Sequence, residues 1–122
     1  MLARVIRFTV LFLLLLVMVP IARQKTRMLF VTSNSMTPIV HACDIVITIK
    51  KPLYHEGDII SFYSRNSKTI TTHAIYKIHH ETILTKGYAN KLPDSTQIYP
   101  AQIIGKIILI IPFSILLPCN LS

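Results

Sequence analysis

A pair of serines in a turn is the first feature of this sequence that could do chemistry. Ser33, Asn34 and Ser35 follow directly after the apolar run at 29–32. A serine in a tight turn at the end of a strand can present its hydroxyl to a cleft in which backbone N–H groups also converge. Serine and asparagine are also common turn residues, so for an isolated segment a purely structural turn is the more frequent case.

Other polar residues stand beside apolar runs further along the chain: Asp44, Gly57 with Asp58, Thr72 with His73, Lys86 with Gly87, and Asp94. Asp44 and Asp58 are expected to fix turns through hydrogen bonds to the backbone. The two cysteines, at 43 and 119, lie in no metal-ligand spacing and do not make a disulfide framework. The adjacent His79 and His80 indicate a polar turn rather than a metal site, and we expect neither metal nor cofactor.

The elements that must position these residues are short strands. Six β-type runs separated by turn signals predict a mainly β domain, at 29–32, 45–49, 59–63, 69–78, 82–85 and 103–110. In the second run, isoleucines alternate with Val46 and Thr48, which predicts a strand buried on both faces. The tail from 103 to 117 is divided by Lys106 and Pro112 into pieces shorter than a bilayer requires. We expect a core strand and a short apolar tail there, with a membrane-dipping tail as the alternative.

An apolar run at 8–22, extended by Val5 and Ile6, precedes the strands in a chain that is 52% hydrophobic. A spanning helix needs about 20 apolar residues and a cleavable signal peptide roughly 7 to 15, so length leaves both interpretations open. The run ends in Val19, Pro20 and Ile21, large residues where a cleavage site needs small ones. The sequence therefore favours an uncleaved anchor. Basic residues flank the run on both sides, so charge does not settle its orientation.

The net charge of +8 has a simple explanation in this arrangement. Five of the 13 basic residues flank the apolar run, where they suit lipid headgroups. The others are scattered and form no basic stripe, so we expect no nucleic acid partner. At 122 residues the chain has room for one small domain, and we expect an anchor with basic flanks at 1–27, a β domain at 28–112 and an apolar tail at 113–122.

Taken in order, these pieces resemble the signal peptidase I family. SNSMTPIVHACDIVITIK is similar to the family's Ser-x-Ser-Met-x-Pro box followed by its Gly-Asp pair and a hydrophobic strand. EGDIISFY looks like the second Gly-Asp box, THAIYKI like the box around the general base, and TKGYANKLPD like the late Lys-Gly box with its downstream aspartate. IIGKIILIIP matches the closing strand. The resemblance covers about residues 30–112, and five boxes in order are far more specific than one.

The resemblance implies a compact signal-peptidase-like β domain and a set of catalytic roles. Ser35 would be the nucleophile, His73 the general base and Asp94 the carboxylate that orients the imidazole. The backbone N–H of Ser35 and the hydroxyl of Ser33 would donate to the developing oxyanion. A histidine base resembles the endoplasmic-reticulum and archaeal type, whereas many bacterial members carry lysine there. Imidazole titrates near neutral pH, where it can accept the serine proton.

Four positions depart from the family's pattern. Asn34 and Cys43 stand where glycine is usual, although asparagine tolerates positive φ better than most residues. Ala74 follows the base where arginine is common. Tyr88 replaces an acidic residue, which leaves Asp94 as the only carboxylate late in the chain.

The implied function is that of a membrane-bound serine endopeptidase, a signal peptidase that cleaves signal peptides from exported preproteins. It would cross the cell membrane once, with its catalytic domain on the extracytoplasmic side. Its partners would be preprotein signal peptides, membrane lipid and, as a candidate, the secretion translocon. Two alternatives stay open: a catalytically degenerate, membrane-anchored binding or assembly factor, and a Ser-Lys peptidase of the repressor-cleaving type, against which the anchor argues. Lys77, on the same strand face as His73, is an alternative base.

Overall fold

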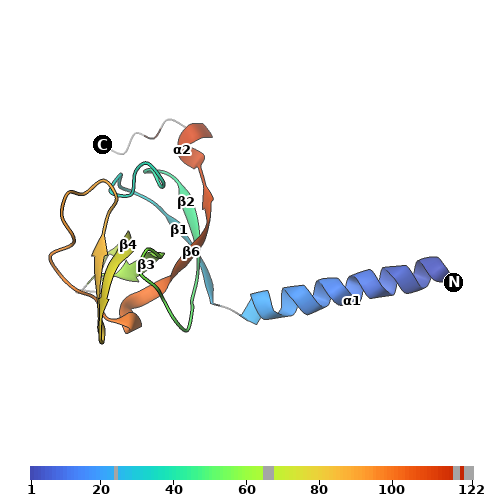
Figure 1. Cartoon of the computed structure of the whole chain (residues 1–122). Coiled ribbons are helices and arrows are strands. Elements are labelled where there is room, and N and C mark those ends of the chain that lie inside the picture. Colours follow the sequence, from blue (N-terminus) through green and yellow to red (C-terminus); the bar gives the residue numbers. More distant parts are fainter. Residues whose placement is uncertain (24, 65–67, 117–118, 120–122) are drawn as a thin grey trace.

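The computed structural model describes residues 1–23, 25–64, 68–116 and Cys119 (Figure 1). Six strands form one sheet, preceded by a long helix and followed by a short one. The elements are α1 (Leu2–Arg23), β1 (Thr26–Phe30), β2 (Ile45–Ile49), β3 (Ile59–Tyr63), β4 (Ile70–His79), β5 (Thr82–Lys86), the 3₁₀ turn η1 (Pro100–Gln102), β6 (Ile103–Ile111) and α2 (Phe113–Leu116). The expected mainly β fold with an N-terminal apolar helix is confirmed.

Helix α1 projects away from the sheet and makes no core of its own (Figure 1). Its 22 residues give a length of about 33 Å, enough for the roughly 30 Å of a bilayer's hydrocarbon core. The window Leu2–Val19 has a mean hydropathy of 2.4, and none of it is buried inside the protein. By length and composition the helix is apolar enough to cross a membrane.

All strand pairs are antiparallel, in the order β1-β2-β6-β3-β4-β5. The first strand differs from the prediction at 29–32, because β1 begins at Thr26 and ends at Phe30. Its charged Arg27 pairs with Thr48 of β2. An edge strand tolerates such a residue because one of its sides faces solvent. Register shifts in β6's pairings with β2 and with β3 mark bulges, which bend strands and increase their twist.

Two groups of buried apolar side chains form the core. One lies between the central strands and consists of Ile60, Phe62, Ile75, Ile83, Ile98 and Ile103. The other fixes the turn after β1 to the sheet and consists of Met36, Val40, Val46 and Ala74. Strand β2 is fully buried at Val46 and Thr48 but only half-buried at Ile45 and Ile47, so burial on both faces is only partly realised.

The C-terminal run forms the predicted strand, β6, followed after Pro112 by the four residues of α2. Of the tail expected at 113–122, residues 117–118 and 120–122 lie outside the described part of the chain. Cys119 forms a disulfide with Cys43, with 5.9 Å between the two Cα atoms. The sequence did not predict this bond, because 76 positions separate the cysteines and only the fold brings them together.

Candidate active site

The structure brings together the three residues to which the sequence assigned catalytic roles. Nε2 of His73 lies 3.1 Å from Oγ of Ser35, and Nδ1 of the same ring lies 2.6 Å from Oδ2 of Asp94. His73 is 7% exposed, so the ring is shielded from water while both nitrogens are occupied. A serine, a histidine and an aspartate linked in this order form the arrangement of a catalytic triad.

With a neutral imidazole, one set of proton positions satisfies every contact. A carboxylate only accepts, so Nδ1 of His73 donates to Asp94 and the neutral ring leaves Nε2 as an acceptor for the Ser35 hydroxyl. The hydroxyl of Ser33, with Oγ 3.2 Å from that of Ser35, then donates to Ser35. In this state Nε2 is ready to take the serine proton.

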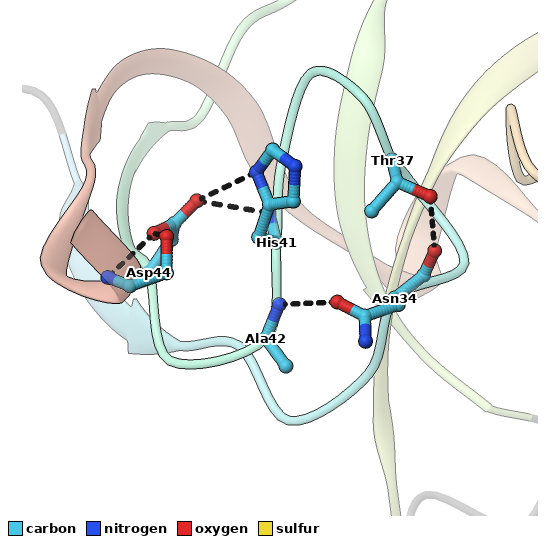
Figure 2. Close-up of polar contacts among 6 residues, drawn as sticks. Asn34, Thr37, His41, Ala42 and Asp44 are labelled. Atoms are coloured by element: carbon cyan, nitrogen blue, oxygen red, sulfur yellow. Dashed lines mark hydrogen bonds and ion pairs between the residues drawn. The ribbon is translucent and has the colours of Figure 1, made fainter. Parts of the chain in front are cut away.

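Ser35 is held by the turn that follows β1. Met36, next to it, is 1% exposed, and its carbonyl accepts the N–H groups of Ile39 and Val40. The hydroxyl of Thr37 donates to the carbonyl of Asn34 over 2.9 Å, which closes the turn from the other side (Figure 2). A buried apolar anchor therefore sits directly after the serine and fixes its backbone against the sheet.

The amide of Ser35 is available to a substrate. Within the described part of the chain, its backbone N–H has no hydrogen-bond acceptor. The carbonyl of Ser35, by contrast, accepts the N–H of Ala89 over 2.9 Å. Among the described residues, the backbone donor that the sequence assigned to the oxyanion is therefore unpaired, and the Ser33 hydroxyl lies 3.2 Å from Oγ of Ser35.

His73 is positioned by the centre of the sheet. It pairs with Ile60 in the ladder between β3 and β4, and its ring meets the edge of Phe62 with 6.4 Å between centroids. Ring pairs at such angles and distances are favourable. Lys77, the alternative base, is exposed and lies four residues further along β4, beyond a shift in register. That is about 13 Å along the strand, so Lys77 is poorly placed to serve Ser35.

Asp94 is positioned by a residue that the sequence did not single out. Thr85, fully buried in β5, donates its hydroxyl to Oδ2 of Asp94 over 2.6 Å. Its carbonyl accepts the Asp94 backbone N–H over 2.8 Å. The carboxylate is thus fixed from both its backbone and its side chain. A buried threonine on an apolar strand carries no distinguishing signal in the sequence.

Gly87 allows the loop after β5 to approach Ser35. A Cβ atom at this position would lie 2.6 Å from the carbonyl oxygen of Ser35 and 3.0 Å from Nε2 of His73. Any side chain at this position would push these groups apart. The glycine of the Lys-Gly pair is therefore required for steric reasons.

A groove of about 540 Å³ opens beside Ser35. Its walls are residues 28–33 and 70–73, with Met36, Val40 and Asn90. Met28, Phe30 and Ile70 are exposed apolar side chains of these walls. Among the described residues that line the groove, none is Asp, Glu, Lys or Arg. β1 is also an edge strand, so its free side can pair with an extended peptide.

Asp44 and Asp58 close two similar turns, as expected of them. Each carboxylate accepts the backbone N–H of the histidine three residues earlier, His41 at 2.8 Å and His55 at 3.0 Å. Figure 2 shows the first of these turns beside Asn34, whose side-chain oxygen accepts the N–H of Ala42 over 2.9 Å.

Both carboxylates are held in the ionised form. Burial acts to raise the pKa of Asp44, but hydrogen bonds from the His41 N–H and from Ser114 outweigh it and keep the pKa below its usual value. Burial likewise opposes ionisation of Asp58, whereas the hydrogen bonds from Lys106 and the His55 N–H lower its pKa.

No protein-family model matches this chain, and no curated protein matches it either. Among the described residues, no group of three or more histidines, cysteines, aspartates or glutamates is arranged to hold a metal ion.

Proposed function

We propose that this chain is a serine endopeptidase of the signal peptidase I type, anchored in the membrane by α1, that removes signal peptides from exported preproteins. The observation that carries the proposal is the continuous hydrogen-bonded arrangement of Ser35, His73 and Asp94. This arrangement supports an active enzyme over a degenerate binding factor. A binding factor without catalytic activity has no need to keep all three groups in contact.

The reaction is acyl transfer. Oγ of Ser35 attacks the scissile carbonyl carbon while its proton passes to Nε2 of His73, and Asp94 stabilises the imidazolium. The Ser35 N–H and the Ser33 hydroxyl donate to the oxyanion. His73 then protonates the departing amine, and water, activated by the same nitrogen, hydrolyses the acyl-enzyme and restores Ser35.

The substrate class follows from the groove and the anchor. A groove whose described lining holds no Asp, Glu, Lys or Arg, beside an edge strand, suits an extended, apolar or small-residue segment, such as the end of a signal peptide. Ser35 lies twelve positions after Arg23, the end of α1, a reach of at most about 40 Å. Cleavage would occur near the membrane surface, where substrate and enzyme are both tethered and modest contacts suffice.

Cleavage of a preprotein by the full-length protein in detergent micelles tests this function. Ser35→Ala should abolish cleavage, and Ser33→Ala should lower it by about 10²- to 10³-fold, the usual effect of losing one oxyanion donor. Ser64→Ala removes a hydroxyl after β3 and serves as the matched control, which should cleave like the parent. A Ser35→Ala variant that cleaves at the parental rate contradicts the proposal, and a parent that binds the preprotein without cleaving it favours the degenerate alternative.

A further inference from the structure

The C-terminal segment, meaning the residues that follow β6, is attached at two points to the Asp44 loop, which lies behind Ser35. Ser114 donates two hydrogen bonds to Oδ1 of Asp44, from its hydroxyl over 2.7 Å and from its backbone N–H over 3.2 Å. Cys119 forms the disulfide with Cys43, the neighbour of Asp44. Ile115 and Leu116 are 81% and 72% exposed, so burial of these side chains does not hold the segment in place. The polar and covalent attachments do.

From this loop, contacts lead to Asn34, the residue before Ser35 (Figure 2). Asp44 fixes the His41 N–H through its other carboxylate oxygen. The next residue, Ala42, donates its N–H to the side chain of Asn34, which precedes Ser35 in the chain. A displacement of the Asp44 loop would therefore also shift the backbone of Ser35.

The backbone conformation of Cys43 indicates that the disulfide has a role in this turn. Cys43 has a φ of 72°, and the corresponding residue of the second turn, Gly57, has a φ of 89°. Glycine adopts such conformations without steric cost, whereas cysteine does not. The first turn thus accepts a strained residue where glycine would fit, and the disulfide is what the cysteine provides in return.

We propose that the C-terminal segment is a positioning element of the active site, and that peptidase activity depends on the Cys43–Cys119 disulfide. The inference rests on the proposed function. Oxidation of the two thiols gives up two electrons and two protons to a protein or small-molecule disulfide, and a dithiol reverses the exchange. With the pair reduced, Ser114 is the attachment that remains among the described residues, the loop behind Asn34 loosens, and Ser35 loses its alignment with His73. The extracytoplasmic side, where disulfides persist, suits this dependence.

Peptide cleavage by the full-length protein in micelles, before and after treatment with dithiothreitol, tests the inference. The probe is an internally quenched peptide that spans a signal-peptide cleavage site. Reduction should lower kcat by up to about 10²-fold, the effect of a misplacement near 1 Å, with little change in KM. Reoxidation should restore kcat, and circular dichroism should show the same secondary structure throughout. Equal kcat in the oxidised and reduced protein overturns the inference alone, whereas an oxidised parent that cleaves nothing overturns the proposed function and this inference with it.

Variants separate positioning from stability. The Cys43→Gly, Cys119→Ser double variant relieves the strained turn, and it should have the low kcat of the reduced parent and not respond to dithiothreitol. Ser114→Ala keeps the disulfide and should lose a smaller part of kcat, which Ser114→Thr should restore. Thr82→Ala removes a hydroxyl from the first residue of β5, which donates to the carbonyl of His79, and should match the parent. A double variant as active as the oxidised parent contradicts the proposal, even if it is less stable.

Discussion

At the scale of single residues, the orientation of the site depends on one carboxylate oxygen. Oδ2 of Asp94 accepts from Nδ1 of His73 and from the hydroxyl of Thr85, each over 2.6 Å. The threonine proton directs the carboxylate at the ring, and the ring in turn presents an unprotonated Nε2 to Ser35. Loss of the carboxylate itself, as in Asp94→Asn, should lower kcat by up to about 10⁴-fold.

Thr85 gives the first prediction at this scale. Thr85→Val keeps the shape of the side chain but removes the donor, and it should lower kcat by about 10- to 100-fold, the worth of one hydrogen bond to a charged group. KM should change little, because Thr85 does not line the groove. Thr85→Ser should restore most of kcat. Kinetics on the quenched peptide measure both constants, and a valine variant with parental kcat would show that Thr85 serves only packing.

The sequence identified some of these residues and not others. Ser35, His73 and Asp94 were found because they fall in ordered boxes that resemble a family. Thr85 was missed because a buried hydroxyl on a strand looks like any β-branched core residue. The disulfide was missed because pairing depends on distances in space, which two isolated cysteines do not reveal.

At the scale of elements, the two turns closed by aspartates fix the loops that lead into β2 and β3. Each aspartate accepts a backbone N–H within its turn and a second donor from elsewhere in the chain, Ser114 for Asp44 and Lys106 for Asp58. Asp58 and Lys106 form an ion pair over 2.7 Å. The turns therefore connect to α2 and β6, which are distant in sequence, and these contacts are strongest while the carboxylates are ionised.

The lowered pKa values of Asp44 and Asp58 predict how stability depends on pH. A carboxylate whose pKa is lower in the folded state stabilises the fold above its unfolded pKa of about 3.9, and this stability is lost as the pH falls through the folded value. Urea unfolding of the full chain in micelles should show a free energy of unfolding that falls steeply below pH 4. Asp44→Asn and Asp58→Asn should be less stable at pH 6 and should lose less on acidification. A parental slope in both variants would refute this role.

The strand boundaries show what apolar pattern can and cannot predict. The predicted limits of β2 and β3 agree with the structure, because each is a dense apolar run between turn residues. The predicted limits of β1 lie too far along the chain. Its pairing with β2 begins at Thr26 and Arg27, whose polar side chains lie on an exposed edge. Pairing with a neighbour, rather than composition, decides where an edge strand begins.

At the scale of the whole molecule, an apolar helix leads almost directly into the wall of the groove. α1 ends at Arg23 and β1, which lines the groove from Met28, begins at Thr26. If α1 spans the membrane as proposed, the triad must lie close to its surface. The proposed function places the triad on the extracytoplasmic side, because a signal peptide is cleaved after translocation has begun.

Labelling of intact cells tests this orientation. The two native cysteines are joined in a disulfide, so a cysteine introduced at Glu81, in the exposed turn between β4 and β5, supplies the reactive thiol. An impermeant maleimide should label Glu81→Cys in intact cells. Arg4→Cys, at the other end of α1, is the matched control and should be labelled only after lysis. The reverse pattern would place the domain in the cytoplasm.

The central claim is that His73 activates Ser35, and the pH dependence of kcat/KM tests it most directly. We expect kcat/KM to rise from acid pH and to level off near neutrality, where imidazole loses its proton. His73→Ala should lower kcat by at least about 10⁴-fold at every pH. A profile that still climbs beyond about pH 9, where an amine would lose its proton, together with an active His73→Ala variant, would contradict the claim and point to Lys77 or another lysine.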